Sequence, residues 1–399
     1  MPRPDPSPPH ITTLVLLAGI GALSMNIFLP SLAAMAEYFE TDYALVQLSI
    51  SAYLGVIGML QLIIGPLSDR YGRRPVMLWA LAIFTLSTLG CLMAESIKMF
   101  LFFRALQAAV AAGIVLSRAI VRDMVPANEA ASMIGYVTMG MSLVPMIGPI
   151  AGGWLGGTFG WQASFIALFL FGLGVFLISW RDLGETNKNP SANFTKQFHA
   201  YPELLRARRF WGYALTAAFA SGAYFGFLGG APFVASEMLG LSEEELGLWF
   251  AAPAIGYMLG NFLSGRFASQ VGINRMMLWG GLVATLGTVI SLVMFGAGLF
   301  HPISLFFPIA FIGVGNGMTL PSANAGIVSV RPNLAGSASG LGGTLMIGGG
   351  AVLAALVGAL LGPETGPWPL VILMIVASGA SVLSTLYVIR RAGLVGAEA

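Results

Sequence analysis

The chain is dominated by apolar runs that contain no Asp, Glu, Lys or Arg and are long enough to cross a lipid bilayer. A transmembrane helix needs about 20 consecutive, predominantly apolar residues. Only 9% of the 399 residues are charged, too few to cover the surface of a water-soluble globule of this size. Seven runs each fit a single helix: residues 11–36, 43–68, 75–94, 210–236, 246–265, 332–363 and 365–389.

Two further uncharged runs are too long for one helix, and each contains an internal break. Residues 130–180 are interrupted by GGTFGW at 156–161, and residues 276–330 by GLFHP at 298–302. Gly and Pro clusters of this kind mark turns, so each run predicts a hairpin of two helices. The segment 99–121, apolar apart from two arginines, adds one more. We therefore expect an all-α membrane protein with twelve transmembrane helices.

The first of these runs could be mistaken for a secretory signal peptide. Ala34, Met35 and Ala36 resemble a cleavage site after an apolar stretch. However, the uncharged run of 26 residues is much longer than the 7–15 residues of a signal-peptide core, and little positive charge precedes it. We interpret residues 11–36 as the first transmembrane helix.

The distribution of Lys and Arg between the expected helices predicts the orientation of the chain. Basic residues collect in cytoplasmic loops of membrane proteins. With the N-terminus inside, sixteen Lys and Arg fall in cytoplasmic segments and only Lys98 falls outside. This ratio favours a multi-pass membrane protein with both termini in the cytoplasm. It also supports the count of twelve helices, because a missed helix would disturb the alternation.

The longest polar stretch, residues 182–209, divides the chain near its midpoint. We expect it to be a cytoplasmic linker between two six-helix halves, residues 1–181 and 210–399. The halves are weakly similar: LSDR at 67–70 has a counterpart in LSGR at 263–266, displaced by 196 residues. Duplicated bundles of this kind are typical of transporters with a substrate site between the halves, near the middle of the membrane.

The most specific motif is GPLSDRYGRRP at residues 65–75, in the short loop after the second expected helix. It resembles the GxLaDrxGrr loop of the major facilitator superfamily, and it lies where that family has it. The glycines permit close packing and a sharp turn, and Asp69 can pair with Arg70 or Arg73. Asp69 is also expected near the start of the eleventh helix, where the helix dipole favours a negative charge. The alternative is an ordinary basic loop. The conformational-gate candidates here are Asp69, Arg70, Gly72, Arg73 and Arg74.

The fourth expected helix carries RALQAAVAAG at 104–113, which resembles the second motif of the superfamily with Ala108 in place of a Gly. An arginine within the membrane is costly unless it faces a wet cavity, so Arg104 is a functional candidate. At 1.5 Å per residue it lies at a depth similar to that of Asn26. The alternative is that Arg104 extends to the outer lipid headgroups. Arg118 lies near the inner boundary, and for it we expect such an extension to the inner headgroups.

The fifth expected helix contains GMSLVPMIGPIAGG at 140–153, which resembles the GxxxGPxxGG motif of exporters in the superfamily. Pro145 and Pro149 bend a helix, while Gly148 and Gly152, one turn apart, allow a neighbouring helix to approach closely. These four residues are further gate candidates and favour a hinge. The alternative is ordinary small-residue packing.

Short matches elsewhere resemble the bicyclomycin and chloramphenicol resistance branch of drug–proton antiporters: RALQA at 104–108, AIVRD at 119–123 and AGSASGL at 335–341. The resemblance covers essentially the whole chain. That branch usually has an acidic residue in the first helix before an aromatic-Leu-Pro sequence, where this chain has Asn26 in MNIFLP. If protons are exchanged, we expect a peripheral carboxylate to carry them, with Glu37, Asp69 and Asp123 as candidates.

The position of helices that line the cavity in this superfamily supplies the other substrate-binding candidates. Aromatic, Met and sparse polar side chains suit amphipathic organic ligands. For each side chain alone, packing is the simpler interpretation. The complete set of substrate-binding candidates is Asn26, Tyr53, Arg104, Gln107, Met141, Met146, Tyr224, Phe227, Tyr257 and Asn316. Asn261 also lies on a helix that lines the cavity in this superfamily.

These observations favour a monomeric secondary transporter that exports small lipophilic or amphipathic drugs by alternating access, in exchange for protons. The alternative is uptake of, or facilitated transport of, a small metabolite without proton coupling. An enzyme is not expected, because the histidines are scattered outside the helices and the chain has no HExxH or phosphate-binding loop. We expect no cofactor, no metal and no nucleic-acid partner; the partners are the substrate, the lipid bilayer and protons. The one cysteine, Cys91, cannot form an internal disulfide.

Overall fold

The computed structural model of the chain describes residues 9–125, 133, 137, 144–187, 201–331 and 334–397. In these ranges the regular elements are helices, and eleven of them are long and apolar enough to cross a membrane. Helices satisfy their own backbone hydrogen bonds, which the interior of a bilayer requires. The all-α prediction is confirmed. The expected fifth span is described continuously only from Val144 onward.

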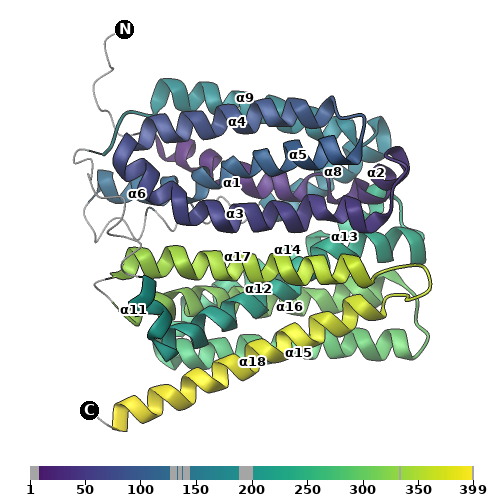
Figure 1. Ribbon diagram of the computed structural model, residues 1–399. Coiled ribbons are helices and arrows are strands. Elements are labelled where there is room, and N and C mark those ends of the chain that lie inside the picture. Colours follow the sequence, from purple (N-terminus) through teal and green to yellow (C-terminus); the bar gives the residue numbers. More distant parts are fainter. Residues whose placement is uncertain are drawn as a thin grey trace.

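The helices form two bundles that lie side by side with their axes nearly parallel (Figure 1). The linker expected at 182–209 is described at both of its ends, and residues 188–200 lie outside the described ranges. The N-terminal bundle consists of α1 (Ile11–Asn26), η1 (Leu29–Ser31), α2 (Leu32–Tyr38), α3 (Tyr43–Tyr71), α4 (Arg73–Leu92), α5 (Ile97–Gln107), η2 (Ala108–Val110), α6 (Ala111–Met124), α8 (Val144–Phe159) and α9 (Gln162–Asp182).

The C-terminal bundle follows the short helix α11 (Tyr201–Arg206). Its second long span is broken into two pieces, α13 and α14, and its first ends in a π-helical turn, η3. The elements are α12 (Arg208–Phe233), η3 (Val234–Met238), α13 (Glu243–Trp249), α14 (Ala251–Val271), α15 (Ile273–Gly296), α16 (Pro302–Ser329), α17 (Ala335–Leu360) and α18 (Trp368–Ala397).

Both breaks predicted within the long apolar runs are confirmed. The chain turns between α8 and α9 at Gly160, which has φ +83°, and between α15 and α16 at Gly298, which has φ +79°. L-residues with a side chain rarely adopt these angles, so glycine is required for the tight turns. His301 then accepts a hydrogen bond from the backbone N–H of Ile303 and caps α16.

The internal repeat is visible in the turns that follow α3 and α14. Gly72 and Gly272 each end one helix and precede the next, with φ of +99° and +83°. The two glycines are 200 residues apart, as are the ends of the equivalent helices at Tyr71 and Val271. The tetrapeptides LSDR and LSGR are only 196 residues apart, a difference of about one helical turn. Similar tetrapeptides therefore lie one turn apart along equivalent helices.

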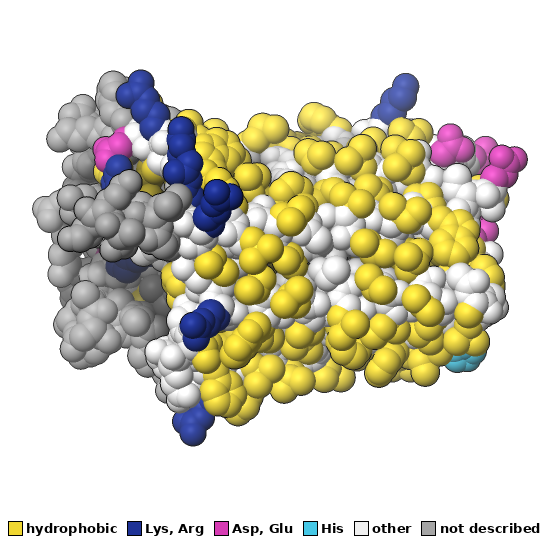
Figure 2. All heavy atoms as spheres, turned by 90° about the horizontal axis from the view of Figure 1, so that it is seen from below, with side chains coloured by type: hydrophobic (Ala, Val, Ile, Leu, Met, Phe, Trp, Pro, Cys, Tyr) yellow, Lys and Arg dark blue, Asp and Glu magenta, His cyan; other side chains and the backbone are white. Residues whose placement is uncertain are grey.

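The side of the molecule is apolar, and charge collects at its ends (Figure 2). Large side chains such as Trp79 and Leu383 are 72% and 68% exposed. An apolar surface this extensive fits lipid and does not fit water. We call the end where α1 begins and α18 finishes the arginine-rich end, since Arg70, Arg73, Arg74 and Arg122 lie there; the other is the opposite end.

Candidate substrate pathway and conformational gate

At the opposite end the two bundles are in close contact, where α8 packs against α13. Ser31 donates a hydrogen bond to the Glu243 carboxylate across this boundary. A Cβ atom at Gly153 would lie 2.4 Å from the Glu243 carbonyl oxygen, and one at Gly247 would lie 2.5 Å from the Pro149 carbonyl oxygen. These contacts leave no space for side chains. The glycines of α8 therefore permit the closure of this end.

Three further hydrogen bonds join the bundles along α3, from the opposite end to its middle. The Tyr43 hydroxyl donates to the Gly229 carbonyl at 2.9 Å, and the Gln47 amide donates to the Ala354 carbonyl at 2.7 Å. Further along α3, the Thr344 hydroxyl donates to the Gly58 carbonyl at 2.8 Å. The hydrogen bonds between bundles that the described residues make all lie in this region.

A cavity of about 230 Å³ separates the bundles at the arginine-rich end. Its walls come from α3 and α6 on one side and from the start of α17 on the other. The lining includes backbone at Gly65, Gly336 and Gly340 and the polar side chains of Gln61, Asp69, Arg73, Arg118, Arg122 and Ser339. The structure is therefore closed at one end and hollowed at the other, as one state of an alternating-access cycle requires.

Arg104 is 1% exposed and lies wholly within the N-terminal bundle. Its guanidinium donates to the Ser49 carbonyl at 3.1 Å, to the carbonyl and hydroxyl of Ser24 at 2.8 and 2.9 Å, and to Gln107 at 2.6 Å. It also stacks over the Tyr53 ring at 3.8 Å. Arg104 thus connects α1, α3 and α5. In this state it contacts protein, with neither lipid headgroups nor the cavity within reach.

Asn26 lies two residues beyond Ser24, at the end of α1, and is 4% exposed. Its amide donates to the Ala22 carbonyl at 2.6 Å, while its Oδ1 atom is buried without a hydrogen-bond partner. The neighbouring helix is α8: a Cβ atom at Gly148 would lie 3.3 Å from the Cβ of Asn26, and one at Gly152 would overlap the Ile27 carbonyl. The predicted close approach along Gly148 and Gly152 is confirmed, and α1 is the helix that approaches.

The other substrate-binding candidates fall into two groups by exposure. Tyr53, Gln107 and Phe227 are at most 1% exposed, and Asn316 is 4% exposed. Phe227 packs edge-on against Phe250 and Phe306 in an aromatic cluster of the C-terminal bundle. The partly exposed candidates are Met146, Tyr224, Tyr257 and Asn261, and Met141 lies outside the described residues.

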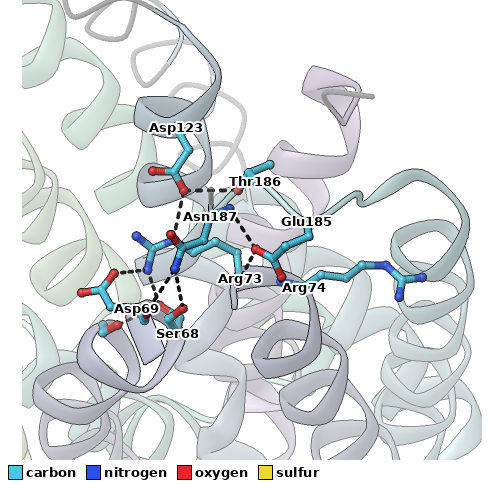
Figure 3. A network of polar contacts seen from close by, with 9 residues as sticks. Ser68, Asp69, Arg73, Arg74, Asp123, Glu185, Thr186 and Asn187 are labelled. Atoms are coloured by element: carbon cyan, nitrogen blue, oxygen red, sulfur yellow. Dashed lines mark hydrogen bonds and ion pairs between the residues drawn. The ribbon is translucent and has the colours of Figure 1, made fainter. Parts of the chain in front are cut away.

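The gate motif forms a polar network that joins α3, α4, α6 and the segment after α9 (Figure 3). Arg73 pairs with Asp69 at 2.5 Å and with Asp123 at 3.1 Å. The predicted pairing of Asp69 with Arg73 is confirmed, whereas Arg70 lies over the Tyr71 ring. Asp69 and Gly336 line the same cavity from opposite walls. In this state Asp69 accepts no hydrogen bond from the described part of α17.

Glu185 is a part of this network that the motif did not reveal. Its carboxylate accepts the backbone N–H groups of Arg73 and Arg74 at 2.9 and 3.2 Å and so caps the start of α4. A Cβ atom at Gly72 would lie 2.3 Å from this carboxylate. Gly72 is therefore needed both for its positive φ and for the approach of Glu185. Arg74 also holds the start of α4 against the end of α9, since its side chain donates to the Leu183 and Trp180 carbonyls.

Arg118 corrects the expectation that it extends to the inner headgroups. Its side chain is exposed and lines the cavity between the bundles. It lies near enough to Tyr257 of α14 for the two side chains to interact electrostatically across the boundary. Hydropathy could not reveal which way the Arg118 side chain points, because packing sets the rotation of the helix about its axis. Arg122, one turn away, made the inner headgroups the simpler expectation. Within the described ranges, no group of three or more His, Cys, Asp or Glu side chains could hold a metal.

Two bundles of membrane-spanning helices, closed against each other at one end and separated by a polar cavity at the other, define an alternating-access transporter. The profile of the Major Facilitator Superfamily matches residues 14–354 and 235–395. The chain belongs to this superfamily.

Individual proteins agree with this assignment. The chain is 30% identical to multidrug resistance protein D of Escherichia coli, over 90% of this chain and 91% of that protein. It is 28% identical to a chloramphenicol resistance protein of Pseudomonas aeruginosa, over 88% and 84% of the two chains. The crystal structure of a D-xylose–proton symporter matches 95% of this chain and 96% of its own with a TM-score of 0.77 at 14% identity, which supports the fold. The predicted resemblance to the drug-resistance branch is confirmed.

Proposed function

We propose that the protein exports small lipophilic or amphipathic drugs across the bacterial inner membrane by alternating access, in exchange for protons. The observation that carries the proposal is the similarity along almost the whole chain to relatives named for multidrug and chloramphenicol resistance. The sequence of α8 supports the export direction, since it resembles the GxxxGPxxGG motif of exporters in the superfamily.

The arginine-rich end is assigned to the cytoplasm by the positive-inside rule. The structure then corresponds to a state closed toward the outside, with its cavity toward the cytoplasm. In the return step α8 separates from α13, the Ser31–Glu243 contact opens, and Asp69 approaches the start of α17. In this cycle Asp69, Arg70, Gly72, Arg73 and Arg74 act as the inner gate, and Pro145, Gly148, Pro149 and Gly152 as the hinge. The protein works as a monomer, because each chain contains both bundles.

The substrate follows the boundary between the bundles. Tyr224, Tyr257 and Met146, which are partly exposed, contact it in the present state. The buried candidates Asn26, Tyr53, Gln107, Phe227 and Asn316 become reachable only when the bundles move. Arg104 acts mainly by fixing the relative positions of α1, α3 and α5.

A drug-susceptibility panel in an efflux-deficient bacterium tests this function. Cells that express the protein should tolerate higher concentrations of chloramphenicol and of other amphipathic drugs than cells with an empty vector, and should accumulate less drug. Drug accumulation above that of the vector control would instead identify an uptake transporter. Unchanged susceptibility to the whole panel would contradict drug export.

A further inference from the structure

The cavity at the arginine-rich end has an excess of positive charge. Arg73 is balanced by its ion pairs with Asp69 and Asp123. Arg118 and Arg122 have no carboxylate within ion-pair distance among the described residues. Both line a cavity shared by the two bundles. A ligand that enters between the bundles therefore meets two arginines whose charge is not neutralised.

Arg118 is placed to contact the polar end of such a ligand, with aromatic surface beyond it. Tyr257 of α14 lies within electrostatic range of Arg118, and Tyr224 of α12 lies within that range of Tyr257. Both tyrosines are partly exposed. The series runs from Arg118 in the N-terminal bundle, near the arginine-rich end, to Tyr257 and Tyr224 near the middle of their spans in the C-terminal bundle. It offers a guanidinium to a charged or polar head and rings to an apolar body.

Among the described residues that line the cavity, no carboxylate offers a matching site for a cation. The uncharged runs that form the spans contain no Asp or Glu, and Asn26 occupies the place where an acid would otherwise face α8. Asp69, the carboxylate in the lining of the cavity, is held by Arg73. Moving an ion out of water is costly unless an opposite charge or hydrogen bonds replace its hydration. The arginines of the cavity can replace the hydration of an anion, whereas the described lining has no free negative charge to replace that of a cation.

We propose that the preferred substrates of the exporter are amphipathic anions, with Arg118 as the residue that selects for negative charge. The proposal rests on the export function above and specifies its substrate class. The membrane potential, negative inside, favours outward movement of an anion and opposes that of a cation. A potential of 100 mV supports a roughly 50-fold gradient for each unit of charge. Export of anions therefore has a driving force although the uncharged runs that form the spans carry no carboxylate.

The test uses the purified full-length protein in liposomes and two xanthene dyes of similar size, anionic fluorescein and cationic rhodamine 123. Potassium gradients with valinomycin set the potential at equal pH on both sides, and protein-free liposomes correct for leakage. We expect protein-dependent fluorescein uptake that increases with an inside-positive potential, and little protein-dependent movement of rhodamine 123. Preference for rhodamine 123, or fluorescein transport that ignores the potential, would overturn the proposal.

Variants of Arg118 separate charge selection from a structural role. Arg118→Gln should reduce the ratio of fluorescein to chloramphenicol transport about tenfold, and Arg118→Lys should retain most of that ratio. Equal ratios in all three proteins would refute a selective role for Arg118. Chloramphenicol transport without fluorescein transport would reject the substrate class and leave drug export intact, whereas failure to transport either compound would reject both.

Discussion

At the scale of single residues, burial and hydrogen bonding distinguish polar side chains that hold the fold together from polar side chains that face the cavity. Arg104 and Arg118 are both arginines of the fourth span, yet one is 1% exposed with four hydrogen bonds and the other faces the cavity. A buried guanidinium without partners would be very costly, so its partners are part of the fold. The two arginines should therefore respond differently to substitution.

Replacement of Arg104 should abolish export and destabilise the protein. Arg104→Ala leaves the Ser24 and Ser49 carbonyls and the Gln107 side chain without their donor, and each such buried group costs about 1–3 kcal/mol. Arg104→Lys should rescue only in part, since an ammonium cannot reproduce the planar set of donors. Thermal unfolding can be followed with a thiol-reactive dye, because Cys91 is the one cysteine and is buried. Arg181→Ala, at an exposed site, is the control; equal stability of both Ala variants would contradict a structural role.

Restoring an acid at Asn26 should strengthen the coupling to protons. The present amide leaves Oδ1 unpaired beside α8, and Asn26→Asp is nearly isosteric, so the protonated form keeps the bond to Ala22. A gradient of one pH unit supplies about 1.4 kcal/mol, or up to tenfold accumulation, for each proton exchanged. Uptake of chloramphenicol into inverted vesicles should therefore depend more on the pH gradient in the variant. If the wild type is already fully driven by the gradient and the substitution changes nothing, the peripheral coupling expected for this chain is wrong.

At the scale of helices, α8 contacts helices of both bundles. One side of it meets α1 at Gly148 and Gly152, and another meets α13 at Gly153 and Gly156. Small residues at these positions let the backbones approach closely, which is the main source of attraction between helices in lipid. Helix α8 can therefore separate from α13 while it stays packed on α1.

A larger side chain at Gly156 should prevent closure of the opposite end. Its Cβ would lie 2.1 Å from a Glu243 carboxylate oxygen and 2.3 Å from the Ser31 hydroxyl. Gly156→Leu should therefore abolish export and expose the boundary between α3 and α17. A cysteine introduced by Gln47→Cys, buried there in the wild type, should then react with a membrane-impermeant maleimide from outside. Gly174→Leu, where a Cβ meets nothing within 4 Å, is the matched control, and equal labelling of both variants would argue against the closure.

Neutralisation of Asp69 should shift the balance between states only moderately. Its side chain is 40% exposed, and Arg73 keeps its second partner, Asp123. A partly exposed ion pair is worth about 0–1 kcal/mol, which corresponds to at most about a fivefold change in the ratio of two states. Asp69→Asn also removes the negative charge that the start of α17 attracts when the inner end is closed. The substitution should therefore favour states open to the cytoplasm and increase labelling of Ser339→Cys in the cavity. Glu95→Gln, at an exposed site, serves as the control, and an unchanged labelling rate would remove Asp69 from the gate.

At the scale of the whole molecule, the ends of the two bundles carry different charges around a common apolar side (Figure 2). The described starts and ends of α3, α4, α14 and α15 alternate between these ends as the twelve-span arrangement requires. The same alternation places the start of α1 and the end of α18 at the same end of the molecule (Figure 1). The orientation in the membrane therefore follows once one end is assigned to the cytoplasm.

Reporter fusions test which end is cytoplasmic. Green fluorescent protein fused after Ala399 should fluoresce, because that reporter folds in the cytoplasm. Alkaline phosphatase fused after Leu299, in the turn before α16, should be active, because it folds only outside. The positive-inside rule predicts both results, with sixteen basic residues on one side and one on the other. Active phosphatase at the C-terminus would invert the assigned orientation and the direction of the proposed cavity.

The sequence by itself determined where the described spans lie along the chain, the turns at Gly160 and Gly298, the family motifs and the close packing along α8. These features depend on hydropathy, on backbone conformation and on residue size, which are local properties of the chain. Only the tertiary structure decided that Arg104 is enclosed within one bundle and that Arg118 faces the cavity. It alone brought Glu185 to α4 and Glu243 to Ser31, over separations of 112 and 212 residues. Such contacts depend on the rotation and packing of whole helices, which the composition of any single helix does not specify.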